Sequence, residues 1–158
     1  MADYASTKTF EAGPTSRVAI PGGRFSDTIW AYTVLRLTFG ANIMLHGVSR
    51  LLAGHAAFLA YLSHYFEKTP AVPVSLLPVF AWVLPPVETT LGLLLLLGLW
   101  TRFALIAGGL VLTALAIGTN LAQDWGVAGL QLIYALVYYY LLVHRDQNVV
   151  SLDGALSR

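Results

Sequence analysis

Residues Leu76 to Leu99 read LLPVFAWVLPPVETTLGLLLLLGL, and this stretch decides the class of fold. At a rise of about 1.5 Å per residue, a helix of this length crosses the hydrocarbon core of a bilayer. Its single charged residue is Glu88, which follows the pair Pro85-Pro86. An ionisable side chain at membrane depth is expensive to bury, so it marks a functional site by default. The two prolines remove backbone donors in the middle of the helix and predict a break or kink there.

The rest of the chain has the same apolar character. Hydrophobic residues make up 57% and charged residues 11%, with a mean hydropathy of +0.69, which excludes an ordinary soluble domain. We predict an all-α integral membrane four-helix bundle over residues 28–143, between an N-terminal tail (1–27) and a C-terminal tail (144–158). The predicted spans are Thr28–Leu52, Leu76–Leu99, Phe103–Ala122 and Val127–Val143.

The distribution of positive charge predicts the orientation of this bundle. Six basic residues lie on the side of the two tails, against two on the opposite side, so the positive-inside rule predicts that both termini are cytoplasmic. The six are Lys8, Arg17, Arg24, Arg102, Arg145 and Arg158, and the two are Arg50 and Lys68.

The connection between the first two spans predicts a further helix. Its first part, HAAFLAYLSHYFEK (residues 55–68), puts five apolar or aromatic side chains on one helical side. This pattern is typical of an amphipathic helix lying on the outer membrane surface. The five are Phe58, Leu59, Leu62, Tyr65 and Phe66.

A second buried charge lies in the first predicted span, at Arg36. Helix rise places it about 6 Å from Glu88 along the membrane normal. An extended arginine side chain covers that distance, so we predict an ion pair between Arg36 and Glu88. Two interpretations of the pair remain open. It fixes the register of two helices, or it forms part of a working site.

Further polar residues outline a predicted cavity in the outer half of the bundle, with Glu88 at its floor. Three recur at four-residue spacing along the first span and two come from the third and fourth spans. They are Asn42, His46, Arg50, Asn120 and Gln131. Such a cavity suits quinone binding between helices. Simpler roles stay open, because Asn120 can cap a helix end and Arg50 can extend to the lipid headgroups.

Several kinds of chemistry are not expected. Cysteine is absent from the sequence, which excludes thiol redox catalysis and cysteine-held iron–sulfur clusters. His46 and His144 fall at opposite ends of the predicted bundle, so they cannot ligate one haem together, and no metal-binding spacing is present. A net charge of +1 gives no reason to expect a nucleic-acid partner. We therefore expect no covalent cofactor, and quinone is the candidate non-covalent ligand.

The sequence resembles the DoxX/DoxD family of small four-helix membrane proteins over roughly residues 34–143. The resemblance rests on LRLTFG, on LHGVSRL, and above all on PPVETTLGLLLLLGLWTR. It implies a bacterial or archaeal cytoplasmic membrane protein like the membrane subunit of a thiosulfate:quinone oxidoreductase. The matching positions are Arg36, His46, Gly47, Arg50, Glu88, Gly92, Gly98, Thr101 and Arg102.

Three functions are compatible with these observations. The first is a quinone-contacting subunit of an electron-transfer complex, respiratory, thiosulfate-linked or photosynthetic. The second is a purely structural accessory subunit packed against other membrane subunits. The third, a small transporter or proton pathway, uses the same buried charges, but four short helices leave little room for a gated path. Whether the chain is itself an enzyme is left open.

Overall fold

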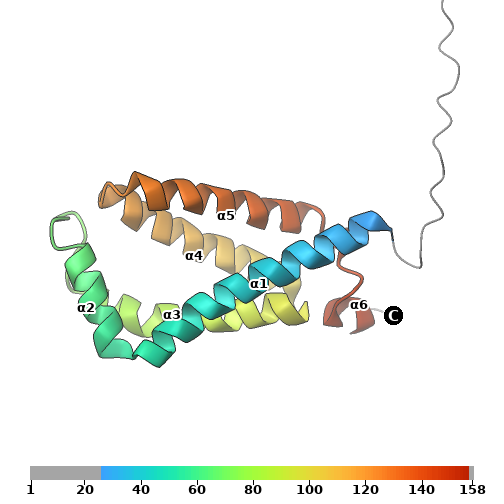
Figure 1. Ribbon diagram of the computed structural model, residues 1–158, viewed down its shortest axis with the longest axis horizontal. Coiled ribbons are helices and arrows are strands. Elements are labelled where there is room, and N and C mark those ends of the chain that lie inside the picture. Colours follow the sequence, from blue (N-terminus) through green and yellow to red (C-terminus); the bar gives the residue numbers. More distant parts are fainter. Residues whose placement is uncertain (1–25, 157–158) are drawn as a thin grey trace, which may run out of the picture.

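A computed structural model of the protein describes residues 26–156, and all regular secondary structure within them is helical (Figure 1). The predicted N-terminal tail lies almost entirely outside the described residues. The elements are α1 (Asp27–Ala53), α2 (His55–Tyr65), α3 (Leu76–Leu97), α4 (Thr101–Leu121), α5 (Trp125–Val143), a 3₁₀ turn η1 (Arg145–Gln147) and α6 (Leu152–Leu156).

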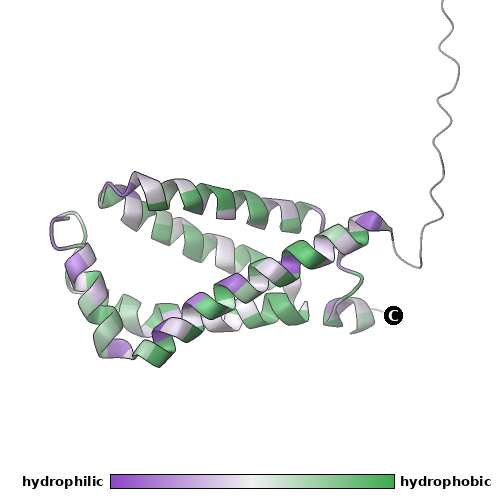
Figure 2. Ribbon diagram, viewed as in Figure 1, coloured by the Kyte–Doolittle hydropathy of each residue, from purple (hydrophilic) through white to green (hydrophobic). Residues whose placement is uncertain are grey.

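Three helices, α3, α4 and α5, are each long and apolar enough to cross a membrane. The pair α1 and α2 forms a fourth candidate span, although its two helices meet at an angle of 107°. Apolar residues predominate along α3, α4 and α5, whereas α1 carries hydrophilic positions between its apolar ones (Figure 2). The prediction of an all-α, multi-pass membrane protein is therefore confirmed, with three to four spans.

The closest approach in the bundle is between α1 and α3. A Cβ atom added at Gly92 of α3 would overlap the backbone of Met44, and one added at Gly47 of α1 would meet the carbonyl oxygen of Pro85 at 2.6 Å. At Gly40 the nearest atom would be the backbone nitrogen of Leu96, at 2.8 Å. Small residues let helix backbones come this close in a membrane, so these glycines set the α1–α3 crossing.

The described residues form two hydrophobic clusters. The larger joins α1, α3, α4 and α5 and contains Tyr32, Phe39, Leu91, Leu95, Ala104, Leu105, Leu112, Tyr138 and Leu141. The smaller joins α2 to the first half of α3 and contains Phe58, Leu62, Leu77, Ala81 and Leu84. Along α3, Glu88 falls between Leu84 of the smaller cluster and Leu91 of the larger. The buried carboxylate therefore separates two apolar regions.

The helix predicted between the first two spans is present as α2. Gly54 joins it to α1 with a φ of 86°, a backbone conformation that favours glycine, and this residue allows the sharp turn. Phe58 and Leu62 are buried against α3. Part of the apolar side that we assigned to the membrane surface thus packs on the protein itself.

The proline pair does not end α3, which is one α-helix from Leu76 to Leu97. Just after the pair, the hydroxyl groups of Thr89 and Thr90 donate to the carbonyl oxygens of Pro85 and Pro86, each at 2.8 Å. The helix therefore continues past the two positions that lack a backbone donor, and Glu88 is held on a helical segment.

The C-terminal segment folds back onto the turn between α3 and α4. The carboxylate of Asp153 accepts hydrogen bonds from the backbone N–H groups of Trp100 and Thr101, both at 2.8 Å. Asn148 donates to the Thr101 hydroxyl at 2.9 Å. Because the first N–H groups of a helix have no partner within it, Asp153 caps α4 from a distant part of the chain. We refer to this end of the bundle as the tail end, and to the opposite one as the α2 end.

Candidate functional site

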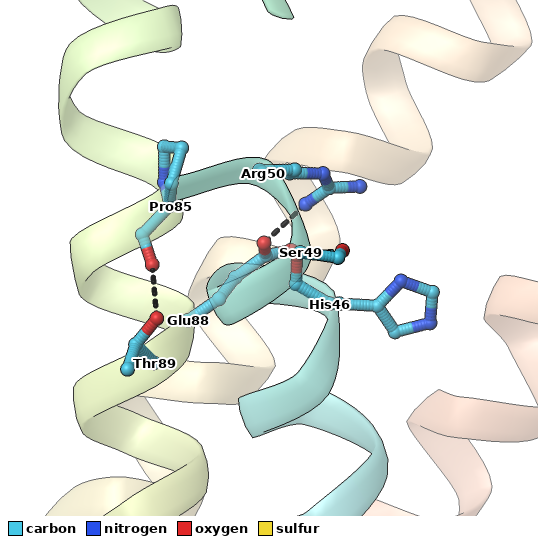
Figure 3. Close-up of polar contacts among 6 residues, drawn as sticks. All are labelled: His46, Ser49, Arg50, Pro85, Glu88 and Thr89. Carbon is cyan, nitrogen blue, oxygen red and sulfur yellow. Dashed lines mark hydrogen bonds and ion pairs between the residues drawn. The ribbon is translucent and has the colours of Figure 1, made fainter. Parts of the chain in front are cut away.

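Glu88 forms an ion pair with Arg50, through its Oε2 and the arginine Nη1 (Figure 3). The side chain of Glu88 is 9% exposed and that of Arg50 is 27% exposed. Arg50 also lies over the ring of Phe58, with its Cζ 5.0 Å from the ring centroid. The last turn of α1, the middle of α3 and the start of α2 thus meet at one pair of charges.

The partner of Glu88 differs from the predicted one, which was Arg36. Arg36 lies on α1 about four helical turns nearer the tail end than Arg50, and it is 2% exposed. Its guanidinium donates to the carbonyl oxygens of Leu95, of Leu96 at 3.0 Å and of Val150 at 2.9 Å. The last carbonyls of a helix have no partner within it, and they attract a positive charge. Arg36 therefore closes the end of α3 and holds the C-terminal segment.

The physical reason for this difference is the geometry of the α1–α3 crossing. The two helices touch through Gly40, Gly47 and Gly92, so the position of each side chain along the crossing is set by those contacts. They bring the end of α1 beside Glu88. Helix rise alone gives the depth of a residue in the membrane but not the face on which it lies.

A cavity of about 360 Å³ opens beside the ion pair at the α2 end. Its walls come from α2 and the loop after it, and from α3, α4 and α5. Arg50 lies on the wall, and most other lining groups are apolar or aromatic. The aromatic side chains are Phe58, Tyr61, Tyr65, Phe66 and Phe80. The site is thus an amphiphilic cavity, with the charged Arg50 at one wall and aromatic rings along the others.

Two hydrogen bonds join other polar groups of the cavity wall to one another. The Tyr65 hydroxyl donates to Asp124 at 2.8 Å, and the Thr119 hydroxyl donates to the Gln131 carboxamide oxygen at 2.7 Å. The backbone N–H of Val127, followed by the Tyr65 hydroxyl, holds the pKa of Asp124 below its ordinary value despite some opposing desolvation. Asp124 is therefore an ionised N-cap of α5 that also orders Tyr65.

The predicted cavity residues do not all meet. Arg50 and Gln131 line the amphiphilic cavity, and Glu88 pairs with Arg50. Asn42 is exposed and accepts from the Tyr134 hydroxyl at 3.1 Å, which links α1 to α5.

His46 and Asn120 were also predicted to line the cavity, but their side chains lie elsewhere. His46 is exposed, and its ring points away from the Arg50–Glu88 pair (Figure 3). Asn120 is exposed and donates back to the carbonyl oxygen of Ala116 within α4, at 2.7 Å. Neither lines the amphiphilic cavity. Whether any of these residues binds a ligand stays a prediction.

A second, small cavity lies beside Glu88 in the interior. Its volume is about 20 Å³, and its lining includes Gly108 and Tyr138. A space of this size holds about one water molecule. The ring of Tyr138 lies against Gly108, where an added Cβ would come within 2.7 Å of it. The interior side of the Glu88 site is therefore narrow, and the larger space lies on the Arg50 side.

Sequence reasoning missed several residues of the site. The aromatic side of α2 was recognised, but as a membrane-facing surface, and Phe58 and Tyr65 instead line the cavity. Glycines also mark the place where α1 and α3 cross. They are Gly40 and Gly47 in α1 and Gly92 in α3. That signal was available in the first and second apolar runs. The capping role of Asp153 leaves no local signal, because its partners lie about fifty residues earlier in the chain.

The fold and the site define a class: a multi-pass helical membrane protein with a buried ion pair beside an amphiphilic cavity. Within residues 26–156, no three His, Asp or Glu side chains are grouped to hold a metal ion.

Residues 28–124, more than half of the chain, match the family model described as methylamine utilisation protein MauE, and the chain belongs to that family. No curated protein and no solved structure matches it. The resemblance to DoxX/DoxD is therefore wrong at the level of family, because the matching family model is a different one.

Proposed function

We propose that this protein is an accessory membrane protein of a methylamine-utilisation system. The observation that carries the proposal is the family match over residues 28–124. That range contains α1 to α4, and with them both members of the Arg50–Glu88 pair and most of the cavity wall.

An accessory role suits the chemistry of the chain. Its sequence contains no cysteine, so the described helices offer no thiol for redox chemistry. The charges at the site neutralise one another within the protein. We infer that the protein works by binding, either to other membrane subunits of an electron-transfer system or to a small molecule in the amphiphilic cavity.

We further propose a bacterial or archaeal cytoplasmic membrane, with both termini in the cytoplasm. The basic residues of the two tails and Arg102 support this orientation through the positive-inside rule. In that orientation the tail end faces the cytoplasm and the α2 end faces outward. The amphiphilic cavity then lies in the outer half of the membrane, where a partner outside the cell membrane can reach it.

The test is deletion of the gene in its own host. We expect the deletion strain to lose growth on methylamine as sole nitrogen source and to grow normally on ammonium. Plasmid-borne wild type restores growth, and a tagged copy purified in mild detergent brings down proteins of the same system. Normal growth of the deletion strain on methylamine would contradict the proposal.

A further inference from the structure

The amphiphilic cavity is large enough for a ligand of considerable size. Its volume of about 360 Å³ falls in the range of small-molecule pockets, about 300–1,000 Å³. Methylamine, with one carbon and one nitrogen, would occupy a small part of it. Tyr61, Leu76 and Ile117 belong to the lining and are exposed, so the cavity opens to the molecular surface. The space therefore suits a larger molecule that enters from the surroundings.

Two polar groups on the wall, Arg50 and Gln131, present N–H donors to the cavity. A guanidinium carries five N–H groups, and Glu88 accepts from the Nη1 of Arg50. The carboxamide oxygen of Gln131 accepts from Thr119, which leaves the amide NH₂ of Gln131 as its donor side. A ligand that satisfies these groups has to bring hydrogen-bond acceptors.

The carboxylate on the same wall already accepts two hydrogen bonds from the protein. Asp124 accepts from the backbone N–H of Val127 at 3.1 Å and from the Tyr65 hydroxyl at 2.8 Å. Asp124 keeps its negative charge at the start of α5, so a cationic ligand is the alternative that the binding test has to exclude. The rest of a ligand that brings acceptors would contact mostly aromatic and aliphatic side chains, including Phe66 and Leu77.

The charge balance restricts the ligand further. Glu88 already compensates the charge of Arg50, so the pair is neutral as a unit. A second anion beside Arg50 would leave an excess negative charge in a region of low dielectric constant, which is strongly unfavourable. A neutral acceptor such as a carbonyl oxygen adds a hydrogen bond to the guanidinium without that cost.

We propose that the amphiphilic cavity binds a neutral, largely apolar molecule that presents a carbonyl oxygen to Arg50 or Gln131. Two sources have this chemistry: the ring of a quinone and the acyl ester of a glycerolipid. The inference goes beyond the proposed function and does not depend on it, because it rests on the cavity wall alone. Loss of methylamine-dependent growth and loss of ligand binding are separate readouts.

The test is binding of defined probes to the full-length protein in mild detergent, followed by native mass spectrometry. The probes are a short-chain benzoquinone and dioctanoylglycerol, with decanoate and dodecylammonium as charged comparators of similar length. The cavity-filling variant is Gly118→Leu, since Gly118 lines the cavity and its added Cβ would meet Phe66 at 3.4 Å. Its matched control on the same helix is Gly109→Leu, where an added Cβ meets nothing within 4 Å.

We expect at least one neutral carbonyl probe to bind the wild type and the control variant more tightly than either charged comparator. Binding to Gly118→Leu should be weaker by about tenfold or more, a loss of about 1.4 kcal/mol. Gln131→Leu, which removes a donor without filling the space, provides a second variant should Gly118→Leu fail to fold. Selective binding of the quinone or of the glycerolipid identifies the source.

Three results would overturn the inference. The first is failure of both neutral probes to bind the wild type. The second is equal or tighter binding of a charged comparator, which would contradict the argument from charge. The third is binding that neither Gly118→Leu nor Gln131→Leu weakens, which would locate the ligand elsewhere.

Discussion

Removal of Arg50 should destabilise the protein far more than removal of Glu88, although the two side chains form one ion pair. In Arg50→Met the carboxylate of Glu88, whose side chain is 9% exposed, stays buried without a partner. In Glu88→Met the guanidinium of Arg50, at 27% exposure, can turn toward the open cavity and solvate its charge. The asymmetry follows from the burial of the two groups.

The expected magnitudes come from this geometry. Breaking a buried pair by removing one partner costs about 3–5 kcal/mol, which we assign to Arg50→Met. Glu88→Met should cost about 1–3 kcal/mol, the range for a partly satisfied buried donor. The double variant places two apolar side chains of suitable length at the site, and such replacements are often close to neutral. Because the two single costs sum to about 4–8 kcal/mol and the double variant is close to neutral, the coupling energy between the two positions should reach about 4–8 kcal/mol.

The assay is thermal unfolding of the purified protein in detergent, followed by fluorescence of its four tryptophans. At about 2–4 °C per kcal/mol, the cost of about 3–5 kcal/mol should lower the Tm of Arg50→Met by about 6–20 °C. The control is Arg102→Met at the exposed start of α4, where a change within about 0.5 kcal/mol is expected. Additive single and double effects, or an Arg50→Met shift no larger than that of Arg102→Met, would refute the reasoning.

Other predictions address the helix crossing and the tail end. Gly92→Ala should cost about 1–3 kcal/mol because its Cβ overlaps the backbone of α1, whereas Gly129→Ala, with open space around it, should be neutral in the same melting assay. Arg36→Met should free the C-terminal segment, and limited proteolysis should then remove that segment faster than from the wild type. Desolvation opposes ionisation of Asp153, yet the backbone N–H groups of Thr101 and Trp100 hold its pKa below the ordinary value. Its folded pKa thus lies below the unfolded one, so Asp153 contributes stability above about pH 4 that is lost as the pH falls through the folded pKa. The stability difference between wild type and Asp153→Asn should accordingly shrink on acidification.

Helix rise does not distinguish between the two arginines of α1 as partners of Glu88. The depth of Arg36 and Glu88 in the membrane was estimated from helix rise, and depth is compatible with several pairings. Arg50 has the same long, charged side chain and lies in the same predicted span, but the sequence pattern places it at the cavity wall or at the lipid headgroups. Because Arg50 pairs with Glu88 and also lines the amphiphilic cavity, the ion pair and the cavity belong to one site.

What the sequence by itself determined is the class of the protein. Long apolar runs with few charges can be satisfied only by helices in a membrane, and Glu88 stood out because a carboxylate in such a run needs a partner. The family followed from residues 28–124, and the aromatic side of residues 55–68 was visible as a periodic pattern.

The tertiary structure alone decided which groups meet. Gly40, Gly47 and Gly92 bring α1 and α3 close enough to fix the rotation of one helix against the other, and this rotation delivers Arg50 to Glu88. The same helix crossing places Arg36 beside the carbonyl oxygens of Leu95 and Leu96 at the end of α3. Helical periodicity shows which face of a single helix is more apolar. Which residues of two helices come into contact depends on how closely their backbones approach, and this is a property of the packed bundle.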